Sequence, residues 1–344
     1  MSQKKIGVLA TGAIVALTIA GCGSSSSAAK SSGKGSASSA SSGSSSSATG
    51  STKKGGLISI IVNDPSNPFW LTEGNVAKAE AVKLGYTANV SASKGDLNTE
   101  SNLVDTAIAN KSRALILDPA NATGSVGNVK KAEAAGIPVF LVNAEIDTPG
   151  VAKAQLISNN AQGAALGAQQ WVKDVGQKGN YVELYGLPTD NNAAIRSDGY
   201  AAVLGQYPGL KKVAQQTANW IRTQGHDKMQ SMLQAHPNII GVISGNDEMA
   251  LGAIAALKEA GKLNSIKVGG FDGSPDAVAA IKSGELQYTV LQPVATFAQK
   301  AVEEADEYLK TGKTGSAVEK QSFNCILITK ANVSKMTGPF TYTP

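Results

Sequence analysis

The sequence holds few of the residues that usually carry metal or disulfide chemistry. Among 344 residues there are two cysteines, Cys22 and Cys325, and two histidines, His226 and His236. Two cysteines cannot build a disulfide framework or a cysteine-rich zinc site, and two histidines cannot by themselves complete a metal cluster. We therefore expect no metal site, and our interpretation of the sequence also includes no cofactor.

Acidic residues are absent from the first 54 positions, although six lysines lie there. The chain has 31 basic residues in all, so 25 remain from Gly55 onward, against 26 acidic residues. The formal charge of +5 therefore belongs to the N-terminal stretch, and the rest is nearly neutral. A nucleic-acid binder needs its basic excess on the domain that touches phosphate, so we expect no nucleic-acid partner.

The N-terminal apolar run from Ile6 to Ile19 spans 14 residues, which is short for a transmembrane helix but typical of a signal-peptide core. It follows two lysines and ends in Leu17-Thr18-Ile19-Ala20-Gly21-Cys22. Small residues directly before a cysteine resemble the lipobox of bacterial lipoproteins. We interpret residues 1–22 as a lipoprotein signal peptide and Cys22 as the acylated residue. An ordinary secretory signal or a short anchor helix is the alternative.

A serine-rich stretch follows, with 16 serines among the 30 residues 23–52. It offers no apolar surface to offset the entropy of ordering, so we interpret residues 23–56 as a disordered tether. A coil of this length reaches about 30 Å. The expected product is an exported chain that is held at the outer face of the cytoplasmic membrane by its lipid anchor alone.

From residue 57 onward, short apolar runs alternate with longer segments of helical period. The runs include 57–62, 114–117, 138–142, 180–185, 239–244 and 266–271. Strands that are apolar on both faces and separated by helices predict parallel sheets covered on both sides. About 290 residues are too many for one small sheet, so we predict an α/β fold with two doubly wound lobes. A (β/α)₈ barrel is the alternative.

Amides, carboxylates and large aromatic residues follow these strands. In open parallel sheets ligands bind outside the carboxyl ends of the strands, so we expect these residues to line a site. Amides and carboxylates exchange hydrogen bonds with hydroxyl groups, and aromatic faces stack on sugar C–H groups. Each residue also has a structural interpretation: Asp272 as a helix N-cap, Asn67 and Asn143 as turn residues, and the tryptophans as core. For Asp247 we favour the N-cap interpretation.

Several of these segments resemble the ribose/galactose-type sugar-binding proteins of ABC importers. The resemblance is carried by Asn67-Pro68-Phe69-Trp70, by Asn246-Asp247-Glu248-Met249-Ala250-Leu251-Gly252-Ala253, by Gly270-Phe271-Asp272-Gly273-Ser274-Pro275-Asp276 and, more weakly, by Ala235-His236-Pro237. It extends from about residue 57 to residue 330. It implies a type I periplasmic-binding-protein fold, in which two lobes joined by a three-strand hinge close around one sugar.

This family pattern implies lobe boundaries. The N-terminal lobe would comprise 57–158 plus 293–324, and the C-terminal lobe 159–292 plus 325–344. The hinge crossings would lie near Ser158, Gln292-Pro293 and Asn324-Cys325, with Cys325 a small apolar residue without a redox role.

The pattern also implies ligand contacts from both lobes. These are Asn67, Phe69, Trp70, Asp118, Asn143, Trp220, Asn246, Asp272 and Gln292. Secondary candidates are Glu145, Asp190 and Arg196, of which Arg196 aligns with a family arginine that we interpret as supporting the lobe.

Two positions depart from the ribose-binding pattern, in which arginines stand where this chain has Ala144 and Ala194. The loss of these guanidinium groups removes planar donors that grip adjacent hydroxyls. We therefore expect a small neutral sugar or polyol other than ribose, and a ligand with an amino group remains open.

The expected function is capture without chemistry, by an extracytoplasmic lipoprotein that acts as a monomer and delivers its ligand to an ABC permease and its ATPase. A receptor subunit that presents a sugar or an autoinducer to a sensor or chemotaxis system shares the same fold and site, and stays the alternative. An enzyme is disfavoured, since no nucleophile elbow and no glycine-rich dinucleotide motif follows any strand.

Overall fold

A computed structural model describes residues 55–344 of the chain. The predicted signal peptide, the lipidation site at Cys22 and all but the last two residues of the predicted tether lie outside the described residues.

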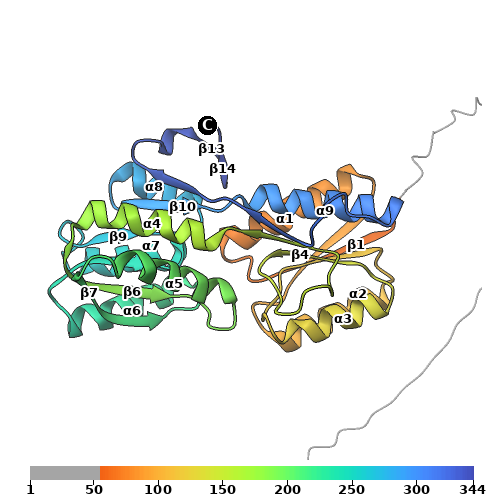
Figure 1. The fold of residues 1–344 in the computed structure, drawn as a ribbon, viewed down its shortest axis with the longest axis horizontal. Coiled ribbons are helices and arrows are strands. Elements are labelled where there is room, and N and C mark those ends of the chain that lie inside the picture. The colour runs from red at the N-terminus through yellow and green to blue at the C-terminus, as the bar shows by residue number, and fades with distance from the viewer. Residues whose placement is uncertain (1–54) are drawn as a thin grey trace, which may run out of the picture. The chain divides into compact units, whose positions relative to one another are not determined.

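The first lobe is built around a six-stranded, fully parallel sheet in the order β11-β5-β4-β3-β1-β2. Its elements are β1 (Leu57–Val62), α1 (Pro68–Lys83), β2 (Thr87–Ala92), α2 (Leu97–Ala109), β3 (Ala114–Leu117), α3 (Ser125–Ala134), β4 (Val139–Asn143), β5 (Ala154–Ser158), α9 (Val294–Thr311) and β11 (Lys320–Phe323). Helices α1 and α9 cover one face of the sheet, and α2 and α3 cover the other (Figure 1).

The second lobe repeats the plan with a sheet in the order β12-β10-β9-β8-β6-β7, in which only β12 is antiparallel to its neighbour. Its elements are α4 (Asn160–Val175), β6 (Lys178–Tyr185), α5 (Asn191–Leu204), β7 (Gly209–Thr217), α6 (Arg222–Ala235), β8 (Ile239–Ser244), α7 (Asp247–Glu259), β9 (Lys267–Gly269), α8 (Pro275–Ser283), β10 (Tyr288–Leu291) and β12 (Ile326–Thr329). Both lobes are doubly wound, so the predicted fold class is confirmed.

The strand order places a ligand-binding edge in each lobe. The winding direction reverses between β1 and β3 in the first sheet and between β6 and β8 in the second. Open α/β sheets bind ligands outside the carboxyl ends of the strands at such a reversal. Both lobes therefore present loops suited to binding at these edges.

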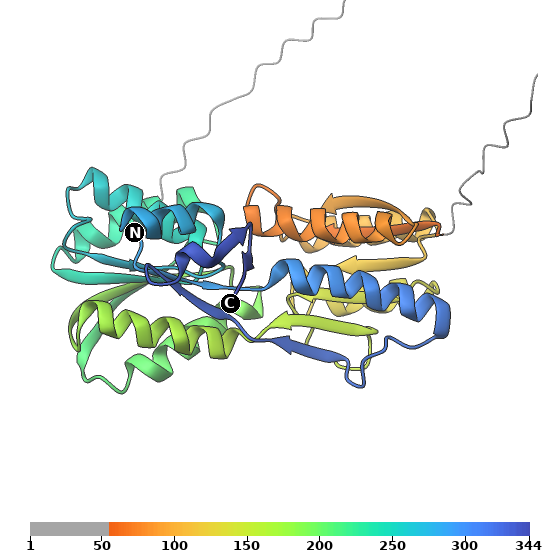
Figure 2. The same cartoon turned by 90° about the horizontal axis from the view of Figure 1, so that it is seen from above.

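The chain passes between the two sheets three times. It leaves β5 at Ser158 to begin α4, leaves β10 through Gln292-Pro293 to begin α9, and leaves β11 through Asn324-Cys325 to begin β12. These crossings join the two halves in Figures 1 and 2. Gln162 of α4 fixes the last crossing by two hydrogen bonds to the backbone of Cys325. Its side-chain oxygen accepts from the Cys325 amide at 2.9 Å, and its side-chain nitrogen donates to the Cys325 carbonyl at 3.2 Å. Burial raises the pKa of the Cys325 thiol to about 12, which keeps it protonated and unreactive.

Local sequence explains where the site-forming helix α1 begins and ends. The Asn67 side chain caps it by accepting a hydrogen bond of 2.9 Å from the Phe69 amide, and Pro68 fits its first position because no amide donor is needed there. The helix ends just before Gly85, whose φ of 93° favours glycine. The cap therefore places Phe69 and Trp70 directly at the carboxyl end of β1.

A C-terminal extension follows β12. It contains a 3₁₀ turn (Val333–Lys335) and a two-stranded hairpin of β13 (Met336–Gly338) and β14 (Thr341–Tyr342). Phe340, between these strands, is 2% exposed and lies edge-on to Phe69 of the first lobe, with ring centroids 5.6 Å apart. The C-terminal extension therefore contacts helix α1 of the first lobe, although β12, the strand that precedes it in the sequence, belongs to the second sheet.

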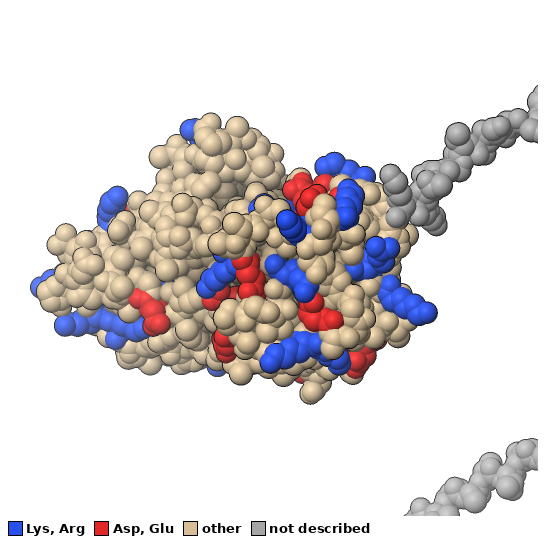
Figure 3. All heavy atoms as spheres, turned by 45° about the vertical axis from the view of Figure 1, so that its right-hand side comes forward, with Lys and Arg blue, Asp and Glu red and all other residues tan. Residues whose placement is uncertain are grey.

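The surface carries charges of both signs. On the face drawn in Figure 3, blue basic and red acidic side chains are interspersed. No helix within residues 55–344 is both long and apolar enough to span a membrane.

Candidate functional site

A small cavity lies at the carboxyl ends of both sheets. Its lining comes from both lobes: Asn67, Phe69, Trp70, Asn143, Asp190, Asn192, Arg196, Trp220, Asn246, Asp272 and Gln292. Trp70 and Trp220 also line a larger outer groove, so they are shared by the groove and the cavity. A small cavity that is walled by both lobes suits a single small-molecule ligand.

The first lobe contributes an aromatic wall that is fixed from behind. Asp118, at the end of β3, accepts hydrogen bonds from the Trp70 indole nitrogen at 2.6 Å and from the Asn143 side chain at 3.0 Å. Phe69 is held by Phe340 and by Phe297, whose ring centroid lies 6.4 Å away. Asp118 does not line the cavity, so it positions two residues that do.

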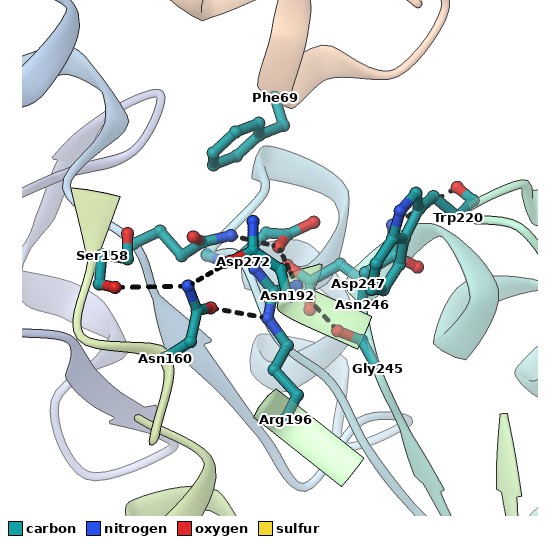
Figure 4. Close-up of polar contacts among 12 residues, drawn as sticks. Phe69, Ser158, Asn160, Asn192, Arg196, Trp220, Gly245, Asn246, Asp247 and Asp272 are labelled. Atoms are coloured by element: carbon teal, nitrogen blue, oxygen red, sulfur yellow. Dashed lines mark hydrogen bonds and ion pairs between the residues drawn. The ribbon is translucent and has the colours of Figure 1, made fainter. Parts of the chain in front are cut away.

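The second lobe contributes a charged wall centred on Arg196. Its guanidinium donates to the Asn160 side-chain oxygen at 2.7 Å and to the Gly245 carbonyl at 2.9 Å, and approaches the Asp272 carboxylate at 3.5 Å (Figure 4). It also lies 4.0 Å from the centre of the Phe271 ring. The arginine is 4% exposed, and it both supports the lobe and lines the cavity.

Backbone strain gathers at the site. Asn143, Asn219, Trp220 and Asp272 have φ of 62°, 51°, 67° and 129°, and they are four of the seven non-glycine residues with positive φ in the described part of the chain. Each such conformation costs about 1–3 kcal/mol and persists only where the surroundings enforce it. Such outliers cluster at ligand clamps, which supports a binding role for this edge.

Several buried polar atoms of the lining have no protein partner among the described residues. They are the side-chain oxygens Asn143 Oδ1 and Gln292 Oε1 and the indole nitrogen Trp220 Nε1. A buried polar group without a hydrogen bond costs about 1–3 kcal/mol. The cavity therefore suits a guest that supplies hydroxyl donors and an acceptor.

Burial raises the pKa of the carboxyl groups around the cavity. The pKa of Asp272 rises to about 7, because burial outweighs the opposing effect of the Arg196 charge. Burial also raises the pKa of Asp190 and, more strongly, that of Asp118. Behind Asp118, Glu73 of α1 is fully buried without a hydrogen-bond partner among the described residues, and its pKa is raised by burial and by the Asp118 charge.

The raised pKa of Asp272 predicts a pH dependence of stability. Between its ordinary pKa of 3.8 and about 7, the folded ligand-free protein keeps a proton that the unfolded chain has released. Raising the pH through this window therefore lowers the free energy of unfolding, and the effect levels off above pH 7. We expect urea denaturation at pH 5 and pH 8 to show a smaller loss for Asp272→Asn than for the unaltered protein. Because the other buried acids remain in the variant, equal losses would contradict the raised pKa.

Most of the residues expected to form a site come together, and two do not. Asp118 stands behind the lining. Glu145 points elsewhere, since its carboxylate accepts from Asn191 at 3.0 Å, pairs with Lys320 and lines a separate surface pocket. The remaining ten residues line the cavity.

Sequence reasoning missed Asn192. Its amide donates to Asp190 at 2.9 Å, and its side chain donates to the Asn143 carbonyl at 3.3 Å, across the two lobes. It lies in the first turn of α5, two residues after the candidate Asp190, so the strand-end rule could have found it if it had been extended to the start of the following helix.

The N-cap interpretation of Asp247 is wrong. Asn246 caps α7 by accepting from the Met249 amide at 2.9 Å, and Asp247 is the first helical residue. The Asp247 carboxylate instead accepts from the amides of Gly273 and Ser274 at 2.9 and 2.8 Å and from the Thr289 hydroxyl at 2.7 Å. Asp247 therefore fixes the loop that carries Asp272, because that loop passes directly over the start of α7.

Comparison with protein families gives a match over residues 58–314 to the periplasmic binding protein domain. The chain belongs to the periplasmic binding protein family. The resemblance expected from the strand-end motifs is thereby confirmed.

Relatives of this periplasmic binding protein include sugar import binding proteins. It is 51% identical to a D-apiose import binding protein of Paraburkholderia graminis over 84% of this chain and 92% of the relative. It is 34% identical to a ribose import binding protein of Salmonella typhimurium over 74% of this chain and 86% of the relative.

A solved structure has the same fold. An ABC transporter solute-binding protein of Bacillus halodurans with bound myo-inositol superposes with a TM-score of 0.76 at 28% identity, over 83% of this chain and 98% of the other. Relatives of this protein thus bind different small polyhydroxylated molecules on one architecture.

Proposed function

We propose that this periplasmic binding protein captures one monosaccharide or polyol between its lobes and delivers it to an ABC transporter permease. The observation that carries the proposal is the cavity itself. It is walled by both lobes, is small, and holds unpartnered buried hydrogen-bonding atoms between aromatic rings. Hydrogen bonds between the lobes, such as Asn192 to Asn143, support a ligand-enclosing closed form. Closure of this kind shifts a population of conformers toward a shape that a permease can recognise.

We propose a pentose as the ligand, with D-apiose ahead of D-ribose. The higher identity to the D-apiose import binding protein supports this order. The site chemistry supports it as well, because Ala144, where ribose-type binders carry an arginine, leaves no guanidinium beside Asn143. Asn143 instead offers one unpartnered amide oxygen to the cavity.

A thermal-shift screen with isothermal titration of the hits tests this proposal. The probes are D-apiose, D-ribose, D-xylose, xylitol and myo-inositol at equal concentrations. We expect D-apiose to give the largest shift, since a ligand at 100 times its Kd adds about 2.7 kcal/mol of apparent stability. A larger shift with D-ribose would reject the proposed order of ligands. No shift with any of the five would count against sugar capture itself.

The same proposal includes how the protein is delivered and organised. We take residues 1–22 as the lipoprotein signal, Cys22 as the anchor to the outer face of the cytoplasmic membrane, and 23–56 as the tether. We take 57–158 plus 293–324 and 159–292 plus 325–344 as the lobes of a monomer without enzymatic activity. Phase partition into detergent, lost in Cys22→Ala, is the measurement for the anchor.

A further inference from the structure

The C-terminal extension is fixed to the second lobe where it begins. The Asn332 side chain donates to the Leu327 carbonyl of β12 at 2.9 Å and accepts from the Thr329 amide at 2.8 Å. The 3₁₀ turn that follows packs against α8, and its Val333 is 5% exposed. These contacts attach the hairpin of β13 and β14 to the second lobe. The extension lies beyond residues 58–314, the part of the chain that matches the family domain.

The tip of this hairpin contacts the other lobe. Phe340 is 2% exposed, and its ring lies edge-on to that of Phe69 in α1, with the ring centroids 5.6 Å apart. Figures 1 and 2 show the dark blue hairpin at the junction of the two halves. Phe69 lines the cavity, whereas Phe340 stands behind it, outside the lining. A segment attached to one lobe therefore supports the cavity wall of the other lobe.

Phe340 has a backbone conformation that an aromatic residue rarely adopts. It belongs to the two-residue turn Pro339-Phe340 between β13 and β14, and its φ is 52°. Glycine and asparagine are the usual residues at a turn position with positive φ, because a bulky side chain there costs free energy. Such strain persists where the surroundings compensate for it, and here the ring is buried. The turn alone does not require phenylalanine, so the ring has a role of its own.

The rings behind the cavity wall form a cluster beside two of the chain crossings. The ring centroid of Phe297 lies 6.4 Å from that of Phe69 and 6.4 Å from that of Phe323. Phe297 lies near the start of α9, just after the second crossing, and Phe323 ends β11, just before the third. Hinge closure changes the backbone angles of a few residues at such crossings. Because these three rings belong to the first lobe, a change in the angle between the lobes moves Phe340 relative to them.

We propose that Phe340 packs on Phe69 in the closed form, where this contact holds the Phe69 ring in the cavity wall and slows reopening of the lobes. Phe340 is buried in a structure whose lobes are joined by the hydrogen bond from Asn192 to Asn143. The assignment rests on the proposed sugar-binding function and makes Phe340 a positioning residue. A contact shifts an equilibrium between two forms only by the difference in its free energy between them. The Phe340–Phe69 contact therefore adds to sugar affinity by stabilising the closed form.

Stopped-flow binding of D-apiose, D-ribose and D-xylose to Phe340→Gly tests this assignment. Glycine suits the left-handed turn position, so the variant keeps the hairpin and loses only the ring. We expect the affinity for the tightest of these sugars to fall by about 10-fold, mostly through faster dissociation, because an aromatic pair is lost from the closed form. Phe340→Leu keeps an apolar side chain and should lose less. If Phe340 served only to form the turn, Phe340→Gly would bind sugar as tightly as the unaltered protein.

A double variant tests whether Phe340 acts through Phe69. Phe69→Leu removes the partner ring and lowers affinity by itself, because Phe69 lines the cavity. In this background Phe340→Gly should cost clearly less affinity than in the unaltered protein, since the contact between the rings is already gone. Fully multiplicative losses would overturn the assignment.

Lys335→Ala is the matched control in the same extension. Lys335 is exposed, and its ammonium group lies 6.0 Å from the centre of the Tyr342 ring within the extension. We expect its sugar affinity to stay within twofold of that of the unaltered protein. A loss as large as that of Phe340→Gly would contradict the assignment, because any change in the extension would then weaken binding.

The outcomes separate this assignment from the proposed function. Sugar binding by the unaltered protein, with affinity within twofold in Phe340→Gly, would reject the role of Phe340 alone. A loss in Phe340→Gly that arises entirely from slower association would also reject it, since the contact is assigned to the closed form. If the unaltered protein binds none of the three sugars, the proposed function is rejected together with the assignment that rests on it.

Discussion

Replacement of Arg196 by methionine is expected to abolish measurable sugar binding and to lower the free energy of unfolding by about 3–5 kcal/mol. Methionine keeps much of the apolar stem but removes the charge that faces Asp272. The carboxylate then stays buried with only the Gln292 amide, at 2.8 Å, as a side-chain donor. Asn160 and the Gly245 carbonyl lose their donor at the same time. We expect an affinity loss of at least about 100-fold, as when one partner of a buried charge pair is truncated.

Lys131→Met provides the comparison for stability. Lys131 pairs with Asp105 at 2.7 Å, and the two side chains are 36% and 58% exposed. Exposed ion pairs contribute about 0–1 kcal/mol, so this variant should unfold close to the unaltered protein. Equal stability losses in the two variants would show that the Arg196 network is no more than another surface ion pair.

Gly186→Ala is expected to weaken sugar binding by about 100-fold, since it displaces an aromatic anchor of the cavity. The added Cβ would meet two carbons of the Trp220 ring at 2.0 and 2.1 Å, so the indole must leave its slot. Gly186 has no left-handed φ, which means that alanine fits the backbone and the collision alone causes the effect. Overpacking of this kind also costs about 1–3 kcal/mol of stability.

Gly127→Ala is the matched glycine substitution. It lies on α3, where a Cβ would meet nothing within 4 Å. We expect unchanged affinity and a gain of up to about 1 kcal/mol, because alanine favours the helix. Wild-type affinity in Gly186→Ala, measured by titration calorimetry with D-apiose, would contradict the role assigned to the position of the Trp220 ring.

The local pattern of apolar residues was sufficient to predict where most of these strands lie in the sequence. The apolar runs 57–62, 114–117 and 239–244 coincide with β1, β3 and β8. The run 266–271 was predicted too long, since β9 covers only Lys267–Gly269. Residues beyond that strand are as apolar as those within it, so composition could not mark its end.

Side-chain direction was less predictable than position along the chain. Asp118 and Glu145 both lie at or just beyond the end of a strand, as do residues of the lining. Asp118 lies behind the cavity lining, where it accepts hydrogen bonds from Trp70 and Asn143. Glu145 lies outside the cavity, where it accepts a hydrogen bond from Asn191 and pairs with Lys320. Asp247 is a first-turn acid in the sequence, and only the loop after β9 makes it a buried acceptor. These partners are 25 or more residues distant in sequence, so no local pattern reports them.

By itself, the sequence determined which segments become buried strands and which polar and aromatic residues follow their carboxyl ends, because apolar periodicity and strand ends are local properties. Tertiary structure alone decided which of those residues share a cavity and which of their atoms remain unpartnered. It brings Phe340 onto Phe69, Gly186 against Trp220, and Arg196 between Asn160 and Asp272. Contacts of this kind join segments that are distant in sequence and depend on how the two lobes pack and are connected. The sequence of a single helix or strand does not determine that packing.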